Sequence, residues 1–223
     1  MFIFVIMKIE ESIAKIAELP ISTQALLPLL VDFKRPYDKI EELVKGKYLY
    51  QLKRGLYVAG TKIKTRHPEL FLLANHLYGP SYISAESALS YWGLIPEKVI
   101  SINSITTRKS KVFRTDLGNF YYFYVPQKGY SVGLCQVPLT PVQTVIMASP
   151  EKALCDLIIQ TRGLNLRSVR QAKQFLEEDL RLDMNAFYAM NASLLADCAS
   201  QCPKSNSLVV LSKMIPSYAS TMA

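Results

Sequence analysis

The hydrophobic pattern changes from helical to alternating at Gly46, and this change constrains the fold of the first third of the chain. Before Gly46, three apolar residues share one face of a helix: Ile40, Leu43 and Val44. Pro36 suits the first position of that helix, and Gly46 suits its end. The sequence therefore predicts a helix over about residues 36–45.

After Gly46, large side chains alternate with others along residues 48–52, as they do in a half-buried strand. Gly55 can adopt the positive φ that the turn 53–55 requires, and residues 56–58 return as a second strand. These patterns predict a β-hairpin directly after the helix.

Two further helices are expected before this one. The spacing of apolar residues predicts a helix over about residues 8–18 that ends before Pro20. Ser22 or Thr23 can cap a second helix, in which Pro28 predicts a kink or a short element. Three helices followed by a hairpin is the order of a winged helix-turn-helix domain.

Positive charge is concentrated in the same part of the chain. The 223 residues carry a formal net charge of +8. Residues 31–66 hold ten cations and four acids, a local balance of +6, whereas residues 1–30 have a balance of −1. Such a basic region favours a phosphate-rich partner, and in a winged helix that partner is commonly duplex DNA.

The candidate DNA-binding residues lie on the third helix, at its N-terminus and at the hairpin tip. The helix would approach base edges in the major groove while the hairpin contacts the backbone or the minor groove. These residues are Lys34, Arg35, Tyr37, Lys39, Lys45, Lys47, Lys53 and Arg54. The same helix also carries Asp38, Glu41 and Glu42, so a winged helix that binds another protein is the alternative.

Residues 67–223 have a different character. Strand patterns predict a sheet within about residues 99–147, and helical patterns predict helices within about 149–215, including one over about 183–199. Ser84 is expected to cap a helix that contains Trp92 in its packing face. A second basic cluster falls on an expected loop, which is interpreted as solvated, with an auxiliary nucleic-acid contact as the alternative: Arg108, Lys109, Lys111 and Arg114.

The sequence offers little that suggests catalysis or metal binding. Ser149, Pro150 and Glu151 form a strong helix start, so Glu151 and Asp156 are interpreted as cap and surface charges. No motif of a nucleotide-binding loop, a serine hydrolase or a zinc protease occurs. The four cysteines lack a metal-ligand spacing and are expected to be reduced. We therefore expect a protein that is not an enzyme and has no cofactor.

The apolar run at residues 2–7 is too short for a signal peptide, and residues 8–11 follow where a cleavage site would stand. It is interpreted either as a strand or as the product of a start codon at Met1 that lies upstream of a native start at Met7. No other apolar run approaches the roughly 20 residues of a membrane span. A cytoplasmic location without membrane contact is expected.

Five strings along the chain together resemble the AbiEi family of antitoxins from type IV, abortive-infection toxin–antitoxin systems. They span residues 35–40 (RPYDKI), 52–58 (LKRGLYV), 73–84 (LANHLYGPSYIS), 87–97 (SALSYWGLIPE) and 149–157 (SPEKALCDL). The resemblance covers about residues 20–160, and the succession of the strings is more specific than any one of them.

The resemblance implies an N-terminal winged helix that represses its own operon by binding inverted repeats. It also implies a C-terminal domain that opposes a cognate nucleotidyltransferase-type toxin. The expected fold is α+β: a winged helix-turn-helix over residues 1–66, then a mixed domain over 67–223 with a mainly antiparallel sheet and C-terminal helices. The alternatives are a protein-interaction module and a plain transcriptional regulator without antitoxin activity.

Overall fold

The computed structural model describes residues 2–97, 99–201 and 204–219, and the chain forms two compact units. The first unit comprises Met1–Leu77 and Pro138–Thr144, and the second comprises Tyr78–Val137 and Val145–Ala223. The division therefore falls after Leu77 and not after residue 66. A short segment from later in the chain also joins the first unit.

Prolines mark the starts of two helical elements in the first unit, η1 and α3. Its helices are α1 (Phe2–Ile16), α2 (Thr23–Leu26), the 3-10 turn η1 (Leu27–Leu30), α3 (Pro36–Lys45) and α4 (Leu70–Leu77). The run 2–7, for which a strand was one expectation, forms the first turns of α1. Pro28 stands at the start of η1 and breaks the second helix into two short elements, as expected.

A three-stranded antiparallel sheet completes this unit, in the order β1-β3-β2. The strands are β1 (Ile21–Ser22), β2 (Leu49–Lys53) and β3 (Leu56–Ala59). The hairpin turns at Gly55 with φ +83°, which confirms the turn expected there. The short strand β1 was not predicted; it pairs Ile21 with Tyr57.

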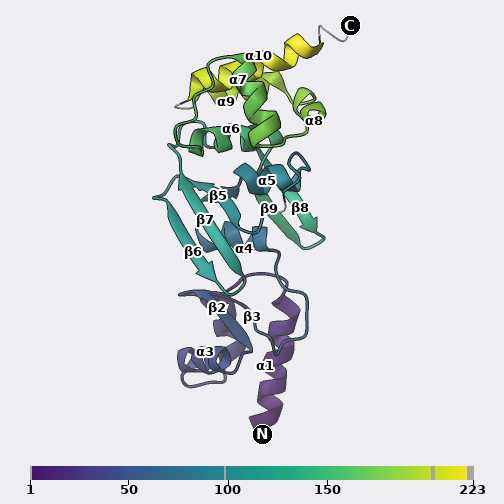
Figure 1. Cartoon of the computed structure of the whole chain (residues 1–223). Coiled ribbons are helices and arrows are strands. Elements are labelled where there is room, and N and C mark those ends of the chain that lie inside the picture. The colour runs from purple at the N-terminus through teal and green to yellow at the C-terminus, as the bar shows by residue number, and fades with distance from the viewer. Residues whose placement is uncertain (1, 98, 202–203, 220–223) are drawn as a thin grey trace. The chain divides into compact units, whose positions relative to one another are not determined.

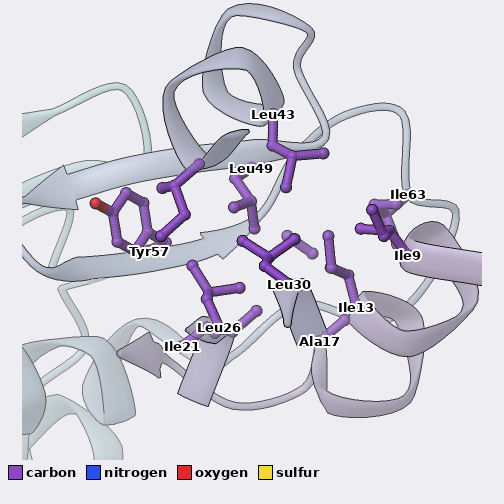
Figure 2. Packing of buried hydrophobic residues seen from close by; sticks show 12 residues of the cluster. Ile9, Ile13, Ala17, Ile21, Leu26, Leu30, Leu43, Leu49, Tyr57 and Ile63 are labelled. Atoms are coloured by element: carbon purple, nitrogen blue, oxygen red, sulfur yellow. The ribbon is translucent and has the colours of Figure 1, made fainter. Parts of the chain in front are cut away.

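One hydrophobic core joins the helices and the sheet of the first unit. Figure 2 shows side chains from α1, η1, α3 and the strands converging on one cluster. Its labelled members are Ile9, Ile13, Ala17, Ile21, Leu26, Leu30, Leu43, Leu49, Tyr57 and Ile63. Burial of this apolar surface fixes α3 against the hairpin, which positions the side chains discussed below.

The second sheet has six strands in the order β6-β7-β5-β4-β9-β8. They are β4 (Ser81–Ile83), β5 (Ile102–Thr106), β6 (Lys111–Thr115), β7 (Gly118–Tyr124), β8 (Leu134–Thr140) and β9 (Gln143–Ala148). β4 pairs antiparallel with β5, and β6 with β7, whereas β5–β7 and β4–β9 are parallel. The sheet is therefore mixed.

Short helices accompany this sheet and follow it in the chain. They are α5 (Ala85–Tyr91), α6 (Pro150–Gln160), α7 (Val169–Gln174) with a π-helical continuation η2 (Phe175–Asp179), α8 (Met184–Tyr188), α9 (Ala192–Ser200) and α10 (Ser205–Ala219). Figure 1 shows α7, α9 and α10 close together at the C-terminal end of the chain. The helix expected over 183–199 is two helices, because Asn191 caps a new one.

The fold is thus α+β, with one antiparallel and one mixed sheet. None of the helices in the described part of the chain has both the length and the apolar character that crossing a bilayer requires.

Candidate nucleic-acid interface

A groove of about 550 Å³ lies between α3 and the β2–β3 hairpin in the first unit. Tyr37, Glu41 and Lys45 line it from α3, where their four-residue spacing places them on one face. Gln51 and Arg54 line it from the hairpin. The groove therefore brings together three of the expected DNA-binding residues, Tyr37, Lys45 and Arg54.

The groove is open to solvent and carries both signs of charge. Tyr37 is 62% exposed, and Lys45, Arg54 and Glu41 are also exposed. Its two cations outnumber its single carboxylate, so the local field favours an anionic ligand. The phenol of Tyr37 and the amide of Gln51 add groups that can donate or accept hydrogen bonds.

Lys34 and Arg35 stand at the N-terminus of α3, where both are exposed. Arg35 occupies the N-cap position without a capping side-chain bond, and its guanidinium lies 3.5 Å from Asp38. Pro36 takes the first helical position as the sequence predicts. The two cations and the helix dipole make this end of the helix positive, which the carboxylate of Asp38 in the first turn partly offsets.

Lys39 was expected on the exposed face of α3, and this expectation is wrong. Lys39 is only 7% exposed, and its ammonium lies 2.7 Å from Glu42 and 5.2 Å from the centre of the Phe33 ring. A lysine stem covers apolar surface well while its ammonium reaches a carboxylate. Lys39 is therefore part of the packing of α3 and is not presented to a ligand.

Lys53 was expected to project from the hairpin tip, but it is held within the first unit. Its ammonium donates a hydrogen bond to the carbonyl oxygen of Leu77 at 2.6 Å and a longer one to that of His76 at 3.4 Å. These carbonyls are at the C-terminus of α4, where the helix dipole attracts a cation. Of the two cations at the tip, Arg54 is the exposed one.

The backbone behind the helix is shaped by Lys47 and Gly60. Lys47 is exposed and has φ +61°, so the residue after the Gly46 cap adopts the left-handed conformation. A Cβ built on Gly60 would lie 2.2 Å from the carbonyl oxygen of Lys47. Only glycine allows this approach.

Lys62, which the site prediction omitted, places its ammonium 4.6 Å from the centre of the Tyr48 ring.

The second unit contains a buried ionic cluster that sequence reasoning missed. Asp156 is fully buried, and its Oδ1 lies 3.0 Å from the ammonium of Lys152, itself 2% exposed. Tyr82 and Ser84 donate to Asp156 Oδ2 at 2.9 and 2.7 Å. Burial raises the pKa of the Asp156 carboxyl, an effect that the ammonium of Lys152 partly offsets.

Two expectations about neighbouring polar residues change accordingly. Ser84 occupies the N-cap position of α5 but makes no capping bond with its side chain, because its hydroxyl donates to Asp156. Glu151 is buried, and it accepts hydrogen bonds from Ser149 Oγ and from the backbone of Asn191. The capping role of Ser149 is confirmed, since its Oγ accepts from the backbone N–H of Lys152.

The second basic cluster is not a solvated loop throughout. Lys111 and Arg114 belong to strand β6, which pairs antiparallel with β7. Arg108 and Lys109 precede this strand.

Trp92, expected to pack, keeps 36% of its surface exposed while its indole N–H donates to the carbonyl of Ala148 at 2.9 Å.

Comparison with known proteins adds one likeness of fold. No family model matches the sequence, and no curated protein matches it either. The structure is similar to the crystal structure of the RV2827C protein from Mycobacterium tuberculosis, with a TM-score of 0.56 and 12% sequence identity. The match covers 96% of this chain and 81% of that one. At this identity the likeness concerns the fold alone.

Proposed function

We propose that the first unit is a winged helix-turn-helix that binds duplex DNA, and that the chain is a DNA-binding antitoxin. The observation that carries the DNA proposal is the groove in which α3 supplies Tyr37 and Lys45 and the hairpin supplies Arg54. Contacts from a helix and a hairpin on one ligand are what a winged helix uses to hold DNA. Lys34, Arg35 and Lys47 add exposed cations to the same unit.

Phosphate attraction is the main source of affinity in this proposal. Each cation that neutralises a phosphate releases a counterion, which makes binding weaken as salt rises. Lys45 and Arg54 are exposed and available for such contacts, whereas Lys39 and Lys53 are engaged with other groups of the protein. The proposal therefore assigns the phosphate contacts to Lys45 and Arg54 and not to Lys39 or Lys53.

The test is a fluorescence-anisotropy titration of the full chain with a duplex taken from upstream of its own reading frame. Arg54→Gln and Lys45→Gln should each weaken binding about threefold to tenfold and lower the salt slope by about 0.9. Arg170→Gln, which removes an exposed cation from α7, is the matched control and should leave the affinity unchanged. Unchanged binding by both groove variants would overturn the DNA assignment.

The antitoxin role is supported by the resemblance to the AbiEi family and is assigned to the second unit. A nucleotidyltransferase-type toxin encoded beside this gene is the partner that the resemblance implies. In cells that express such a toxin, the full chain should restore growth, and the Lys45→Gln/Arg54→Gln double variant should restore it equally. Failure of the intact chain to restore growth would contradict this role and leave a transcriptional regulator.

A protein-binding winged helix is the second candidate, because Glu41 faces the groove and Asp38 and Glu42 are exposed on the same helix. Acidic groups repel DNA phosphates but can pair with a basic protein surface. The titration described above separates the two, since a protein-binding module would not bind duplex DNA in a manner that depends on Lys45 and Arg54.

A further inference from the structure

A second positive surface lies on the β6–β7 hairpin, within the second unit. Arg108, Lys109, Lys111 and Arg114 follow one another over a few residues, with Asp116 in the turn beyond them. Residues 67–223 have a net charge of only +3, and residues 108–116, with these four cations and one acid, have a local balance of +3. Within the described ranges, the ion pairs found do not include any of these four cations.

Two of these cations, Lys111 and Arg114, belong to strand β6 of the hairpin. The register of β6 on β7 pairs Lys111 with Tyr122 and Arg114 with Asn119. The ammonium of Lys111 lies 4.6 Å from the centre of the Phe113 ring and 5.5 Å from that of Tyr78. The Tyr78 hydroxyl also donates to the backbone carbonyl of Lys109 at 3.2 Å. These contacts order Lys111, which shares a face with its partner Tyr122, whereas Arg114 on the other face is positioned by the pairing of β6 with β7.

The two faces of this hairpin differ. Side chains alternate along a strand, so Val112 and Arg114 share a face with Tyr121 and Phe123. Val112 is 45% exposed, Arg114 is exposed, and both rings are partly exposed. The opposite face carries Phe120 and Tyr122, which are buried.

The exposed face combines two aromatic rings with a cation. The rings of Tyr121 and Phe123 are nearly parallel, at 13°, with centres 6.5 Å apart. Figure 1 shows β6 at the outer edge of the sheet with β7 beside it. Toward the interior of the sheet, this face borders on β5, where the side-chain amide of Asn103 donates a hydrogen bond to one carboxylate oxygen of Glu86. Partly exposed rings that share a face with an exposed guanidinium, for which the described residues supply no ion pair, are suited to a ligand with planar groups and phosphates.

We propose that the Val112, Arg114, Tyr121 and Phe123 face of the β6–β7 hairpin binds single-stranded nucleic acid. Single strands expose the faces of their bases, which stack on aromatic side chains, and their phosphates attract the neighbouring cations. A duplex keeps its base faces stacked internally, so the rings would gain little from it. This site is separate from the groove of the first unit and does not depend on duplex binding there.

Protection of a sheet edge is the structural alternative for the charges on β6. Lysine and arginine on an edge strand discourage pairing with another chain. That role accounts for Lys111 and Arg114, but it does not account for partly exposed, parallel rings on β7, which is an interior strand. The rings and Arg114, which share one face of the hairpin, favour a ligand that engages both.

The test is a fluorescence-anisotropy titration of the full chain with a labelled oligouridine of about 15 nucleotides, a length typical of such sites. Arg114→Gln should weaken binding at least threefold and lower the salt slope by about 0.7. Phe123→Leu, which keeps apolar volume but removes the ring, should weaken binding at least threefold without a change in slope. Arg170→Gln should leave the affinity unchanged.

Three results would overturn the proposal: no binding of the oligouridine, equal loss of oligouridine and duplex affinity in both hairpin variants, or self-association of Arg114→Gln with unchanged oligouridine affinity. The last result would assign edge protection instead. If Phe123→Leu lowers the melting temperature, Arg114→Lys is used to test the proposal instead. This variant retains the charge and should restore most of the oligouridine affinity that Arg114→Gln loses. Duplex binding that depends on Lys45 and Arg54 is measured separately, so either proposal can fail alone.

Discussion

The ammonium of Lys53 lies 2.6 Å from the carbonyl oxygen of Leu77 and joins the tip of the β2–β3 hairpin to the C-terminus of α4. A helix end has unpaired carbonyls and a partial negative charge, and a lysine ammonium satisfies both. This contact uses the charge of Lys53 to stabilise the first unit. It leaves Arg54 as the exposed cation of the tip.

Lys53→Met should therefore destabilise the protein without weakening duplex binding. We expect a loss of about 1–2 kcal/mol in the free energy of unfolding, typical of a charged hydrogen bond at a helix end. Arg54→Met is the matched control from the adjacent position and should change stability by less than about 0.5 kcal/mol. Urea unfolding followed by circular dichroism measures both. A loss of DNA affinity in Lys53→Met as large as in Arg54→Met would contradict the assignment.

The same substitution should change the titration of His76. Burial lowers the pKa of the His76 imidazole, and the ammonium of Lys53 lowers it further. In Lys53→Met the pKa should rise toward the ordinary value of about 6.5. Because the pKa of His76 is lower in the folded than in the unfolded protein, the free energy of unfolding falls as the pH drops below about 6.5. In Lys53→Met the two pKa values lie closer together, so this pH-dependent loss of stability should be smaller. NMR titration of the imidazole resonances in both proteins tests the direction; an unchanged or lower pKa would contradict it.

The sequence predicted α3 and the hairpin because their signals are local. Pro36 starts the helix, Gly46 caps it, and Gly55 supplies the positive φ of the turn. The burial of Lys39 was missed because its cause is not in the helix: Phe33 lies in the preceding segment, and its ring packs against the lysine. Helical spacing predicts which residues of α3 share a face, but it does not show which residues outside the helix cover that face.

The second sheet was harder to predict for related reasons. β6 carries exposed cations and β8 contains Pro138, so neither has the pattern of a regular half-buried strand. β4 is only three residues long and depends on partners distant in sequence. Asp156 resembled a surface acid because Tyr82 and Ser84, which hold it, lie more than 70 residues earlier. Long-range pairing determined each of these features.

Gly60→Ala should be strongly destabilising, because the added Cβ would lie 2.2 Å from the backbone oxygen of Lys47. Backbone atoms cannot rotate away, so the loop must shift at a cost of about 2–3 kcal/mol. Gly163→Ala is the contrasting variant: its φ of +74° is strained for alanine, but the space around it is open. We expect about 1 kcal/mol for that change. Thermal and urea unfolding compare the two, and an equal or smaller effect at Gly60 would contradict the close approach.

The buried pair of Lys152 and Asp156 should be the most sensitive point of the second unit. An ion in the interior requires its partner, since removal of one charge leaves the other without solvation. Asp156 also accepts from two hydroxyls, so its carboxylate has three partners of different elements. An exposed ion pair of the same i, i+4 spacing, Lys173 with Glu177, is available for comparison at 3.7 Å.

Lys152→Met should lower the free energy of unfolding by about 3–5 kcal/mol and raise the pKa of Asp156 further, because the offsetting ammonium is lost. The double variant Lys152→Met/Asp156→Asn should recover part of this loss, since the amide carries no charge and still accepts from Tyr82 and Ser84. Lys173→Met should change stability by less than about 0.5 kcal/mol, because solvent screens the exposed pair. Urea unfolding of the four proteins provides the comparison. If Lys152→Met is no more harmful than Lys173→Met, the two charges are not coupled in the interior, and the cluster does not stabilise the second unit.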